Sequence, residues 1–390
     1  MNDKAVLALT MITLGQVGLC VPLLLARSVR TRAYLPLAVF FAASGLMAAG
    51  PAVVAFAPGL EAVFLAGSLP AYLLLGPALW LYVQGLTSET EWRPTPDHGW
   101  HLAPAGLGLL ATGLMLGLPA NVRDRMLLEG ELVDRPYPAM VALLVFVLIL
   151  CWIAQSAAYG VVVFLRLGRY RRRLKDLFAS NENRELRWIG WLLIVVGGVW
   201  LGAFATLVAE NFLGRVLLSR EAGATMAMIL VWSLALWGLR QKPGFEGRYL
   251  EAALDTPLEV APARKYQRSA LGPEQARRIA SKIDAVMTQD QLYLDPALSL
   301  HGLARRLAIS PNHISQTLNE TLGMSFFDYV NRWRIQAAKP LIAAGDETIL
   351  TTALAVGFNA RSSFYKAFRI ETGQTPNAFR AQAMADARQP

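Results

Sequence analysis

Long apolar runs dominate the first 240 residues and most constrain how the chain can fold. A helix rises 1.5 Å per residue, so about 20 apolar residues are needed to cross the hydrocarbon layer of a bilayer. Seven runs reach or approach that length, the fourth and seventh being the shortest: Ala5–Ala26, Leu35–Phe56, Leu60–Gln84, Leu102–Leu118, Ala139–Leu165, Trp188–Val208 and Ala224–Leu239. The runs predict an all-α chain whose residues 1–240 form a bundle of seven transmembrane helices.

The amino-acid composition agrees with an N-terminal half that is embedded in a lipid bilayer. Hydrophobic residues make up 54% of the chain and charged residues 17%, whereas soluble domains are about a quarter charged. Charges are sparse up to about Leu239 and ordinary in density afterwards. The two cysteines, Cys20 and Cys151, lie inside apolar runs, so neither a disulfide framework nor a cysteine-based zinc site is expected. The first run has no positive leader, and we expect no cleavable signal peptide.

Loop charges predict the orientation of the seven spans. Cytoplasmic loops collect Lys and Arg. With seven spans, the first, third and fifth loops and the C-terminal tail share the side that holds Arg27, Arg30, Arg32, Arg93, Arg166, Arg169, Arg171, Arg172, Arg173, Lys175, Arg184, Arg187, Arg240 and Lys242. The other side holds Lys4, Arg123, Arg125, Arg135, Arg215 and Arg220. The bias predicts an outside N-terminus and a cytoplasmic C-terminal domain in a bacterial inner membrane.

Ionisable groups inside the runs are nearly absent, which argues against a transporter or a membrane enzyme. Proton relays and ion paths place such groups deep in the bundle, but Glu61 and Glu210 fall near the predicted outer ends. Asp97, His98 and His101 sit together at the cytoplasmic mouth of the fourth span. A three-ligand metal site is conceivable there, and solvated loop residues are the favoured interpretation. No catalytic residue, metal or cofactor is predicted.

The chain changes character after Leu239. Residues 241–272 are polar and contain Pro243, Gly244, Pro257 and Pro262, which is typical of a cytoplasmic linker. A periodic helix is expected from about Pro273 to Gln289. Residues 273–390 are expected to form the C-terminal domain.

An internal repeat at an offset of 49 to 50 residues carries the functional signal. The first copy opens with Leu300, Leu303, Ala304 and Leu307, and the second with Ile349, Thr352, Ala353 and Val356 at the same helical spacing. A short turn and a second helix follow in each copy. The buried faces predicted for these second helices are Ile314 and Leu318 in the first copy and Phe364, Ala367 and Phe368 in the second. Gly323 and Gly373 suit left-handed helix ends. We therefore predict two helix-turn-helix units, at about residues 299–323 and 348–373, joined by a helix at about 326–344.

The second helix of such a unit enters the DNA major groove. Its outward face must carry groups that reach base edges, above all Arg, Asn and Gln. The residues predicted to face bases are Asn312, His313, Ser315 and Gln316 in the first unit, and Arg361, Ser362, Tyr365 and Lys366 in the second. The predicted backbone contacts are Ser310, Asn319 and Arg369. Both faces are expected to lack acids; a plain helical bundle with polar faces is the alternative.

Residues 299–380 resemble the DNA-binding domain of the arabinose-operon regulator (AraC/XylS) family. The resemblance rests mainly on Ala353-x-x-x-Gly357-Phe358-Asn359-x-x-Ser362-x-Phe364-x-x-x-Phe368-Arg369 and Thr372-Gly373-x-Thr375-Pro376-x-x-Phe379-Arg380. In the first unit Leu303-Ala304, Ser310, Ile314-Ser315 and Leu322-Gly323 match. The resemblance implies two reading helices in successive major grooves. With Lys265–Leu300 included, the region resembles the subgroup of the family that is fused to membrane domains. Pro340 in the joining helix, Gln316 and Thr351-Thr352 depart from the family pattern.

Three hypotheses follow for the whole chain. The favoured one is a membrane-embedded transcription regulator whose membrane domain senses a signal, with the helix Pro273–Gln289 as the transmitter. The second treats the spans as a passive anchor that tethers DNA or a partner protein, and the third is a transporter-like protein with a regulatory appendage. The partners considered are double-stranded DNA, the lipid bilayer, RNA polymerase, an unidentified signal ligand and a second copy of the chain.

Overall fold

The structure is a computed structural model that describes residues 2–89, 91–131, 135–180, 186, 188–191, 193–195, 197, 220–241 and 271–386. The chain divides into two compact units. Unit 1 comprises Met1–Leu167 and Leu186–Asp255, and unit 2 comprises Gly168–Glu185 and Thr256–Pro390. The described residues form helices and connecting loops, with one isolated antiparallel bridge between Phe178 and Ser299.

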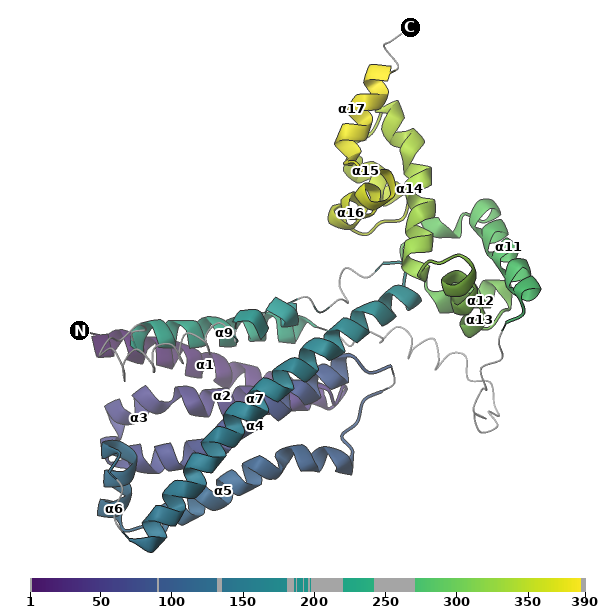
Figure 1. Ribbon diagram of the computed structural model, residues 1–390. Helices are drawn as coiled ribbons and strands as arrows, with labels where there is room; N and C mark the ends of the chain where they lie inside the picture. Colours follow the sequence, from purple (N-terminus) through teal and green to yellow (C-terminus); the bar gives the residue numbers. More distant parts are fainter. Residues whose placement is uncertain are drawn as a thin grey trace. The chain divides into compact units, whose positions relative to one another are not determined.

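Unit 1 is a bundle of long apolar helices (Figure 1). Its elements are α1 (Asn2–Ser28), α2 (Tyr34–Ala48), α3 (Gly50–Phe56), η1 (Pro58–Leu60), α4 (Glu61–Leu86), η2 (Pro96–Leu102), α5 (Ala103–Leu116), α6 (Ala120–Asp124), the π-helical turn η3 (Arg125–Glu129), α7 (Pro136–Leu177) and α9 (Arg220–Arg240). Helix α1 packs against α2 and α9, and α4 packs against α2 and α5. Leu69, Leu73, Met115 and Leu148 lie in one buried cluster that joins α4, α5 and α7.

Several helices of unit 1 are suited to a membrane. Five described helices are long and apolar enough to cross one, and the bent pair α2 and α3, which meet at 43°, raises the number to six. Large apolar side chains such as Leu19, Leu109 and Phe164 point outward and are 60 to 71% exposed, as expected for surfaces that contact lipid. The sixth predicted run, Trp188–Val208, lies mostly outside the described residues.

Helix α7 is too long to serve only as a span. Its 42 residues rise about 63 Å, roughly twice the hydrocarbon thickness. Its residues up to Leu167 belong to unit 1, and its last turns from Gly168 belong to unit 2. The helix therefore carries the chain from the apolar unit into the second unit without a helical break.

His98 and His101 differ from the solvated loop residues expected from the sequence. Both lie on the 3-10 helix η2 and are half-buried. The ring of His101 lies 4.4 Å from that of Trp80 (centroid to centroid), and His101 Nδ1 is 2.6 Å from the Tyr159 hydroxyl. The loop turns back onto α4 because these aromatic surfaces can then be shielded from water.

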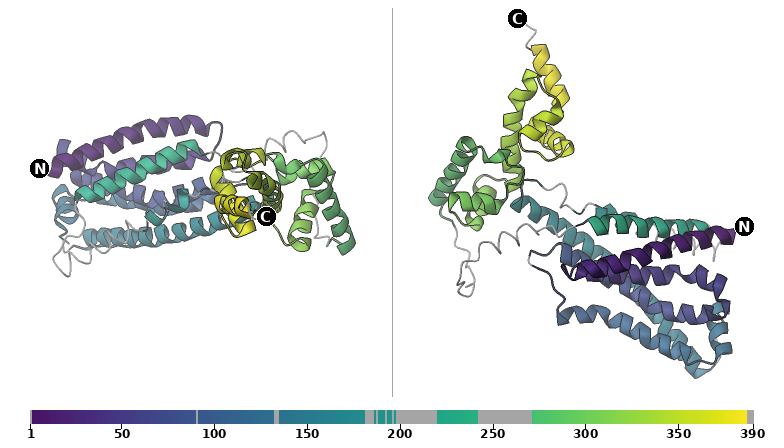
Figure 2. Two further views of the ribbon diagram at one scale, coloured as in Figure 1. Left: turned by 90° about the horizontal axis from the view of Figure 1, so that it is seen from above. Right: turned by 180° about the vertical axis from the view of Figure 1, so that it is seen from behind.

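Unit 2 contains two groups of short helices joined by one long helix, as the two views in Figure 2 show. Its elements are α11 (Pro273–Gln289), η4 (Leu292–Leu294), α12 (Leu300–Leu307), α13 (Pro311–Gln316), the π-helical turn η5 (Thr317–Thr321), α14 (Phe326–Ala344), α15 (Ile349–Ala355), α16 (Arg361–Thr372) and α17 (Pro376–Asp386). Helix α14 runs through Pro340 as a single helix. Its Ile335, Ala338 and Ile342 are buried against α15 and α16.

Helix α11 is part of this packed unit. Its apolar face, Ala276, Ile279, Ile283 and Met287, is buried. The Tyr329 hydroxyl on α14 donates to Asp284 Oδ1 at 2.5 Å. Burial and this hydrogen bond raise the pKa of Tyr329, so the phenol remains a protonated donor. The bond fixes α11 to the start of α14.

Candidate DNA-binding surface

The first helix pair is α12 and α13, and local chemistry sets its ends. Ser299 caps α12 by accepting a hydrogen bond from Gly302 N at 3.0 Å. Helix α12 ends where Ala308 takes a left-handed conformation at φ 53°. Ser310 then caps α13 by accepting from His313 N at 3.3 Å, with Pro311 at the first helical position. Such caps satisfy amide groups that a helix start would otherwise leave unpaired.

The second helix pair is α15 and α16. Thr348 caps α15 by accepting from Thr351 N at 3.1 Å. The tight turn contains Gly357 at φ 90°, and α16 ends at Gly373 with φ 77°. The corresponding glycine of the first copy, Gly323, has φ 66°. Both glycines thus adopt the left-handed conformation expected from the sequence, which costs glycine little.

The inner faces of the second helices are buried, as the repeat predicts. Ile314 and Leu318 are fully buried in the first copy, and Phe364 and Phe368 in the second. The Phe364 and Phe368 rings lie 5.6 Å apart (centroid to centroid), within range for an aromatic contact. This packing turns the opposite faces of α13 and α16 toward solvent.

None of the residues predicted to contact DNA is buried. Asn312, Arg361, Ser362 and Lys366 are exposed, as are Ser310, Asn319 and Arg369, whereas His313, Ser315, Gln316 and Tyr365 are half-buried. The structure therefore places the two sets on the outward sides of two separate helix pairs. Whether they contact bases is not tested by this arrangement and remains a prediction.

Local contacts hold several of these side chains in place. On α16, Arg361 NH2 donates to the Tyr365 hydroxyl at 2.9 Å, and the guanidinium carbon lies 4.9 Å from the Tyr365 ring centroid. After α13, Asn319 Nδ2 donates to Ser315 Oγ at 3.3 Å. These contacts restrict the rotamers of long polar side chains, which lowers the entropy that would be lost on binding.

The first face also contains an acid that the sequence interpretation left out. Gln316 Nε2 donates to Glu320 Oε2 at 2.9 Å. The sequence could have predicted that Glu320 lies next to Gln316, because residues four positions apart share a helix face. The face near Gln316 is consequently not free of acids, and this carboxylate orients the Gln316 amide.

Arg334 on α14 joins the two helix pairs and was not identified from the sequence. Its side chain is fully buried. Its Nε donates to Tyr293 O at 2.7 Å, in η4, and its Nη2 donates to Asp295 O at 2.8 Å, directly after η4. Its guanidinium carbon also lies 5.4 Å from the centroid of the Phe358 ring, in the turn of the second pair. A buried arginine of this kind is stable because its donors are paired with carbonyl oxygens.

Gly357 lies where the turn of the second pair contacts the residues before α12. A Cβ added at this position would lie 2.7 Å from both Tyr293 O and Leu294 O. Nearby, Asn359 Nδ2 donates to Pro296 O at 3.3 Å. The turn of the second pair therefore packs directly on the loop that precedes the first pair.

Comparisons with known proteins concern this C-terminal region. A family model described as "Helix-turn-helix domain" matches residues 303–382. An uncharacterized HTH-type transcriptional regulator of Staphylococcus aureus (strain COL) is 35% identical over 104 residues, which are 27% of this chain and 14% of that protein. The uncharacterized HTH-type transcriptional regulator YijO of Escherichia coli (strain K12) is 30% identical over 129 residues, 32% of this chain and 45% of that protein.

Two solved structures are similar to part of the chain. A protein of unknown function from Listeria innocua is 26% identical and covers 27% of this chain and 96% of its own, with a TM-score of 0.25. The C-terminal domain of AraT, a response regulator from Geobacillus stearothermophilus, is 27% identical and covers 29% of this chain and 88% of its own, with a TM-score of 0.24.

The matched relatives are regulators, not enzymes. The chain spans 14% of the length of the Staphylococcus aureus relatives and 45% of YijO. The family model matches only residues within the C-terminal domain. Residues 303–382 form an AraC-type helix-turn-helix domain, the DNA-binding module of transcription regulators, at the C-terminal end of a chain rich in apolar helices.

Proposed function

We propose that this protein is a membrane-embedded transcription regulator that reads DNA with two helix-turn-helix units. The observation that carries the proposal is the combination, in one chain, of a matched helix-turn-helix domain and at least five helices long and apolar enough to cross a membrane. Seven spans, with the N-terminus outside and the C-terminal domain in the cytoplasm, give the arrangement in which this domain meets DNA.

The proposed reading surfaces are the outward faces of α13 and α16. Asn312, His313, Ser315 and Gln316 face bases in one major groove, and Arg361, Ser362, Tyr365 and Lys366 face bases in the next. Ser310, Asn319 and Arg369 contact the backbone. The exposed positions of most of these side chains support the proposal, and the amide and guanidinium groups among them are those that pair with adenine and guanine.

The proposed role of unit 1 is to sense a signal and change how unit 2 binds DNA. A passive anchor is the main competing function, and RNA polymerase or a second copy of the chain are further candidate partners. Replacing residues 1–240 with an unrelated membrane anchor distinguishes a sensor from a passive anchor. A regulator loses its response to conditions when the spans are exchanged, whereas an anchored protein keeps the same promoter activity under every condition.

DNA selection tests the reading function directly. The full chain in lipid nanodiscs is incubated with random-sequence duplexes over a salt series, beside Arg361→Ala and Gln316→Ala. The proposal predicts enrichment of one bipartite motif with its halves about 10 base pairs apart. Each variant relaxes one half of the motif. Weak, salt-sensitive binding without a motif would contradict sequence reading, because backbone contacts alone produce that behaviour.

A further inference from the structure

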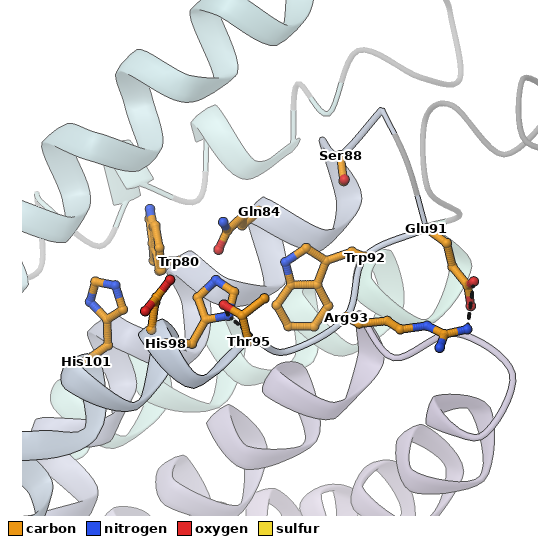
Figure 3. A pocket seen from close by; sticks show the side chains of 10 residues that line it. Trp80, Gln84, Ser88, Glu91, Trp92, Arg93, Thr95, His98 and His101 are labelled. Atoms are coloured by element: carbon orange, nitrogen blue, oxygen red, sulfur yellow. Dashed lines mark hydrogen bonds and ion pairs between the residues drawn. The ribbon is translucent and has the colours of Figure 1, made fainter. Parts of the chain in front are cut away.

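A cavity of 580 Å³ lies in unit 1 where α4 ends and the chain returns through η2. Its lining comes from α4, from the segment after it and from η2: Trp80, Gln84, Ser88, Glu91, Trp92, Arg93, Thr95, Asp97, His98 and His101. Figure 3 shows Trp80, His98 and Trp92 in a row, and Gln84 on α4, the helix that also carries Trp80. The volume is in the range of cavities that hold small molecules.

Aromatic rings form the walls of this cavity and are held by contacts with one another, with Thr95 and with Tyr159. The His98 ring lies 5.7 Å from Trp92 and 6.1 Å from Trp80 (centroid to centroid). Thr95 N donates to His98 Nδ1 at 2.9 Å, so the proton of a neutral His98 is on Nε2. His101 is held by the Tyr159 hydroxyl on α7. The walls are therefore preorganised flat surfaces, suited to a planar ring.

Two lining side chains each have a buried polar atom without a hydrogen-bond partner among the described residues. They are Gln84 Oε1, an acceptor, and Trp92 Nε1, a donor. Buried polar atoms without partners are unfavourable and uncommon in folded proteins. A molecule in the cavity that donates one hydrogen bond and accepts another would satisfy both.

The charged lining residues favour an uncharged occupant. Arg93 and Glu91 form an ion pair at 3.1 Å, with side chains 72% and 64% exposed. Asp97 is exposed as well. These charges are paired or solvated, so the cavity offers no buried charge to neutralise a ligand.

We propose that this cavity, the Trp–His pocket, binds a small, uncharged, planar aromatic molecule that carries both a hydrogen-bond donor and an acceptor. That this pocket is the site where the chain senses its signal rests on the proposed function. The helix that leads to unit 2 contacts the residue next to the pocket. Arg166 Nε on α7 donates to Thr87 Oγ1 at 2.6 Å, beside the lining residue Ser88 and two residues before α7 enters unit 2.

Ligand-observed NMR on the full chain in nanodiscs tests the pocket. The probes are benzamide, nicotinamide and 4-hydroxybenzamide, each planar and able to donate and accept. Saturation transfer to at least one probe is expected in the wild type. Trp92→Phe and Gln84→Met each remove one polar partner and keep the bulk, and should weaken binding about 2- to 13-fold, as expected for one hydrogen bond.

Trp100→Phe is the matched control, because Trp100 is on η2 beside His98 and His101 but is 83% exposed and not part of the lining. The proposal is overturned if no probe binds, or if Trp92→Phe and Gln84→Met bind the probes as the wild type does. DNA selection on the same samples is an independent measurement. Loss of probe binding with the motif intact rejects the pocket alone, whereas probe binding without a motif rejects the reading function alone.

A second inference rests on a different observation, the chain directly after α7. The docking segment, Phe178–Ser180, packs within unit 2. Phe178 pairs with Ser299, the residue that caps α12, and Ala179 N donates to Leu298 O at 3.2 Å. Phe178 is 8% exposed and Ala179 is 1% exposed. The segment is thus a buried part of the DNA-binding unit.

Arg334 also donates hydrogen bonds to the docking segment. Its NH1 donates to Ser180 Oγ at 3.2 Å and to Ala179 O at 3.4 Å. The same guanidinium holds Tyr293 O and Asp295 O and lies near the Phe358 ring. Within unit 2, the docking segment therefore lies where Arg334 joins the two helix pairs.

We infer that the docking segment controls DNA binding by setting how the two helix pairs are held at Arg334. The effect on DNA binding rests on the proposed function, whereas the packing of the docking segment does not. A change in α7, which is continuous with this segment, would reach α12 through Ser299 and α14 through Arg334. Helix α11, which the sequence predicts to be the transmitter, is packed within unit 2, and its transmitter role stays a prediction.

A cysteine cross-link tests docking in the full chain. Directly opposed residues of an antiparallel bridge bring their Cβ atoms close enough for a disulfide. Phe178→Cys with Ser299→Cys, in a background with Cys20→Ala and Cys151→Ala, should form one in native membranes under mild oxidation. Phe178→Cys with Ser281→Cys, an exposed residue of α11, should not. Absence of the first disulfide overturns the inference.

Ala179→Asp tests the regulatory part. The new carboxylate cannot stay in a site that is 1% exposed, so the segment should leave it. DNA affinity is then expected to change about 5- to 150-fold, the usual range of couplings between sites. Ser281→Asp adds the same charge at an exposed position and should leave affinity unchanged. Unaltered affinity for Ala179→Asp, with the disulfide formed in the cysteine pair, would show that docking has no regulatory effect.

Discussion

Arg334 shows what sequence patterns miss at the scale of single residues. Pattern reading assigns charged residues to the surface, yet this arginine is fully buried because its donors meet carbonyl oxygens from distant parts of the chain. Apolar spacing, by contrast, identified Leu303, Ala304, Ile314 and Phe364 as inner-face residues, and all are buried. Local periodicity predicts which face of a helix is buried, but it does not predict contacts between connecting segments that are far apart in the sequence.

Gly357→Ala is predicted to destabilise unit 2 strongly. Its positive φ disfavours a side chain by about 1–2 kcal/mol, and the added Cβ would also collide with Tyr293 O and Leu294 O. Gly323→Ala is the control, since it has a similar positive φ but nothing within 4 Å of the added Cβ. Thermal denaturation of the purified chain should show a clearly larger loss for Gly357→Ala. Equal losses would mean that the close packing of this turn is wrong.

Arg361→Ala is predicted to weaken binding to the selected duplex by about 1–3 kcal/mol and to relax one base position. The Arg361 guanidinium is exposed and oriented by Tyr365. Arg277→Ala removes the same charge from an exposed position on α11 and should affect all duplexes alike. Fluorescence anisotropy at one salt concentration compares the two. A uniform loss with Arg361→Ala would assign this residue to the backbone instead of to a base.

At the scale of helices, boundaries with strong local signals were predictable. The helices expected over Pro273–Gln289 and about 326–344 correspond to α11 and α14. Their starts follow from Pro273 at the first helical position and from Ser325, which caps α14 by accepting from Asp328 N at 3.2 Å. The π-helical turn η5 had no such signal. The extension of α7 through its basic run to Leu177 agrees with the sequence, in which the run Arg166–Lys175 favours a helix extension over a nucleic-acid surface.

Pro340→Ala is predicted to stabilise α14. Proline inside a helix removes one backbone hydrogen bond, a cost of up to about 3 kcal/mol, and Pro340 is exposed within α14. The apparent melting temperature of unit 2 should rise, whereas Lys339→Ala, at the neighbouring position, should change it little. A lower melting temperature for Pro340→Ala would show that the packing of α14 depends on the shape that the proline imposes.

At the scale of the whole molecule, composition separated an apolar half from a DNA-binding half, but it could not assign Gly168–Glu185. Its Arg and Lys residues predict a cytoplasmic location, but they do not predict that the last turns of α7 and Phe178–Ser180 belong to unit 2 through contacts with residues more than 100 positions later. Long-range contacts of this kind have no period in the sequence. The number of spans stays a prediction too, since most of Trp188–Val208 lies outside the described residues.

Single cysteines in a chain without Cys20 and Cys151 should report the orientation. Val29, 77% exposed after α1, is predicted to be cytoplasmic, and Leu128, 46% exposed in the loop before α7, is predicted to be outside. A membrane-impermeant maleimide added to intact spheroplasts should label Leu128→Cys, and label Val29→Cys only after lysis. The reverse pattern would place the C-terminal domain on the wrong side for DNA.

The most direct test of the account is flotation of DNA with reconstituted vesicles. The full chain is inserted into liposomes, washed with carbonate to remove peripheral protein, and mixed with a fluorescent duplex that bears the selected motif. The account predicts that the protein and the motif duplex float together at physiological salt, and that a scrambled duplex or Arg361→Ala leaves the DNA in the dense fraction. Floating protein that carries no motif duplex, or protein released by carbonate, would contradict a membrane-embedded regulator that reads DNA.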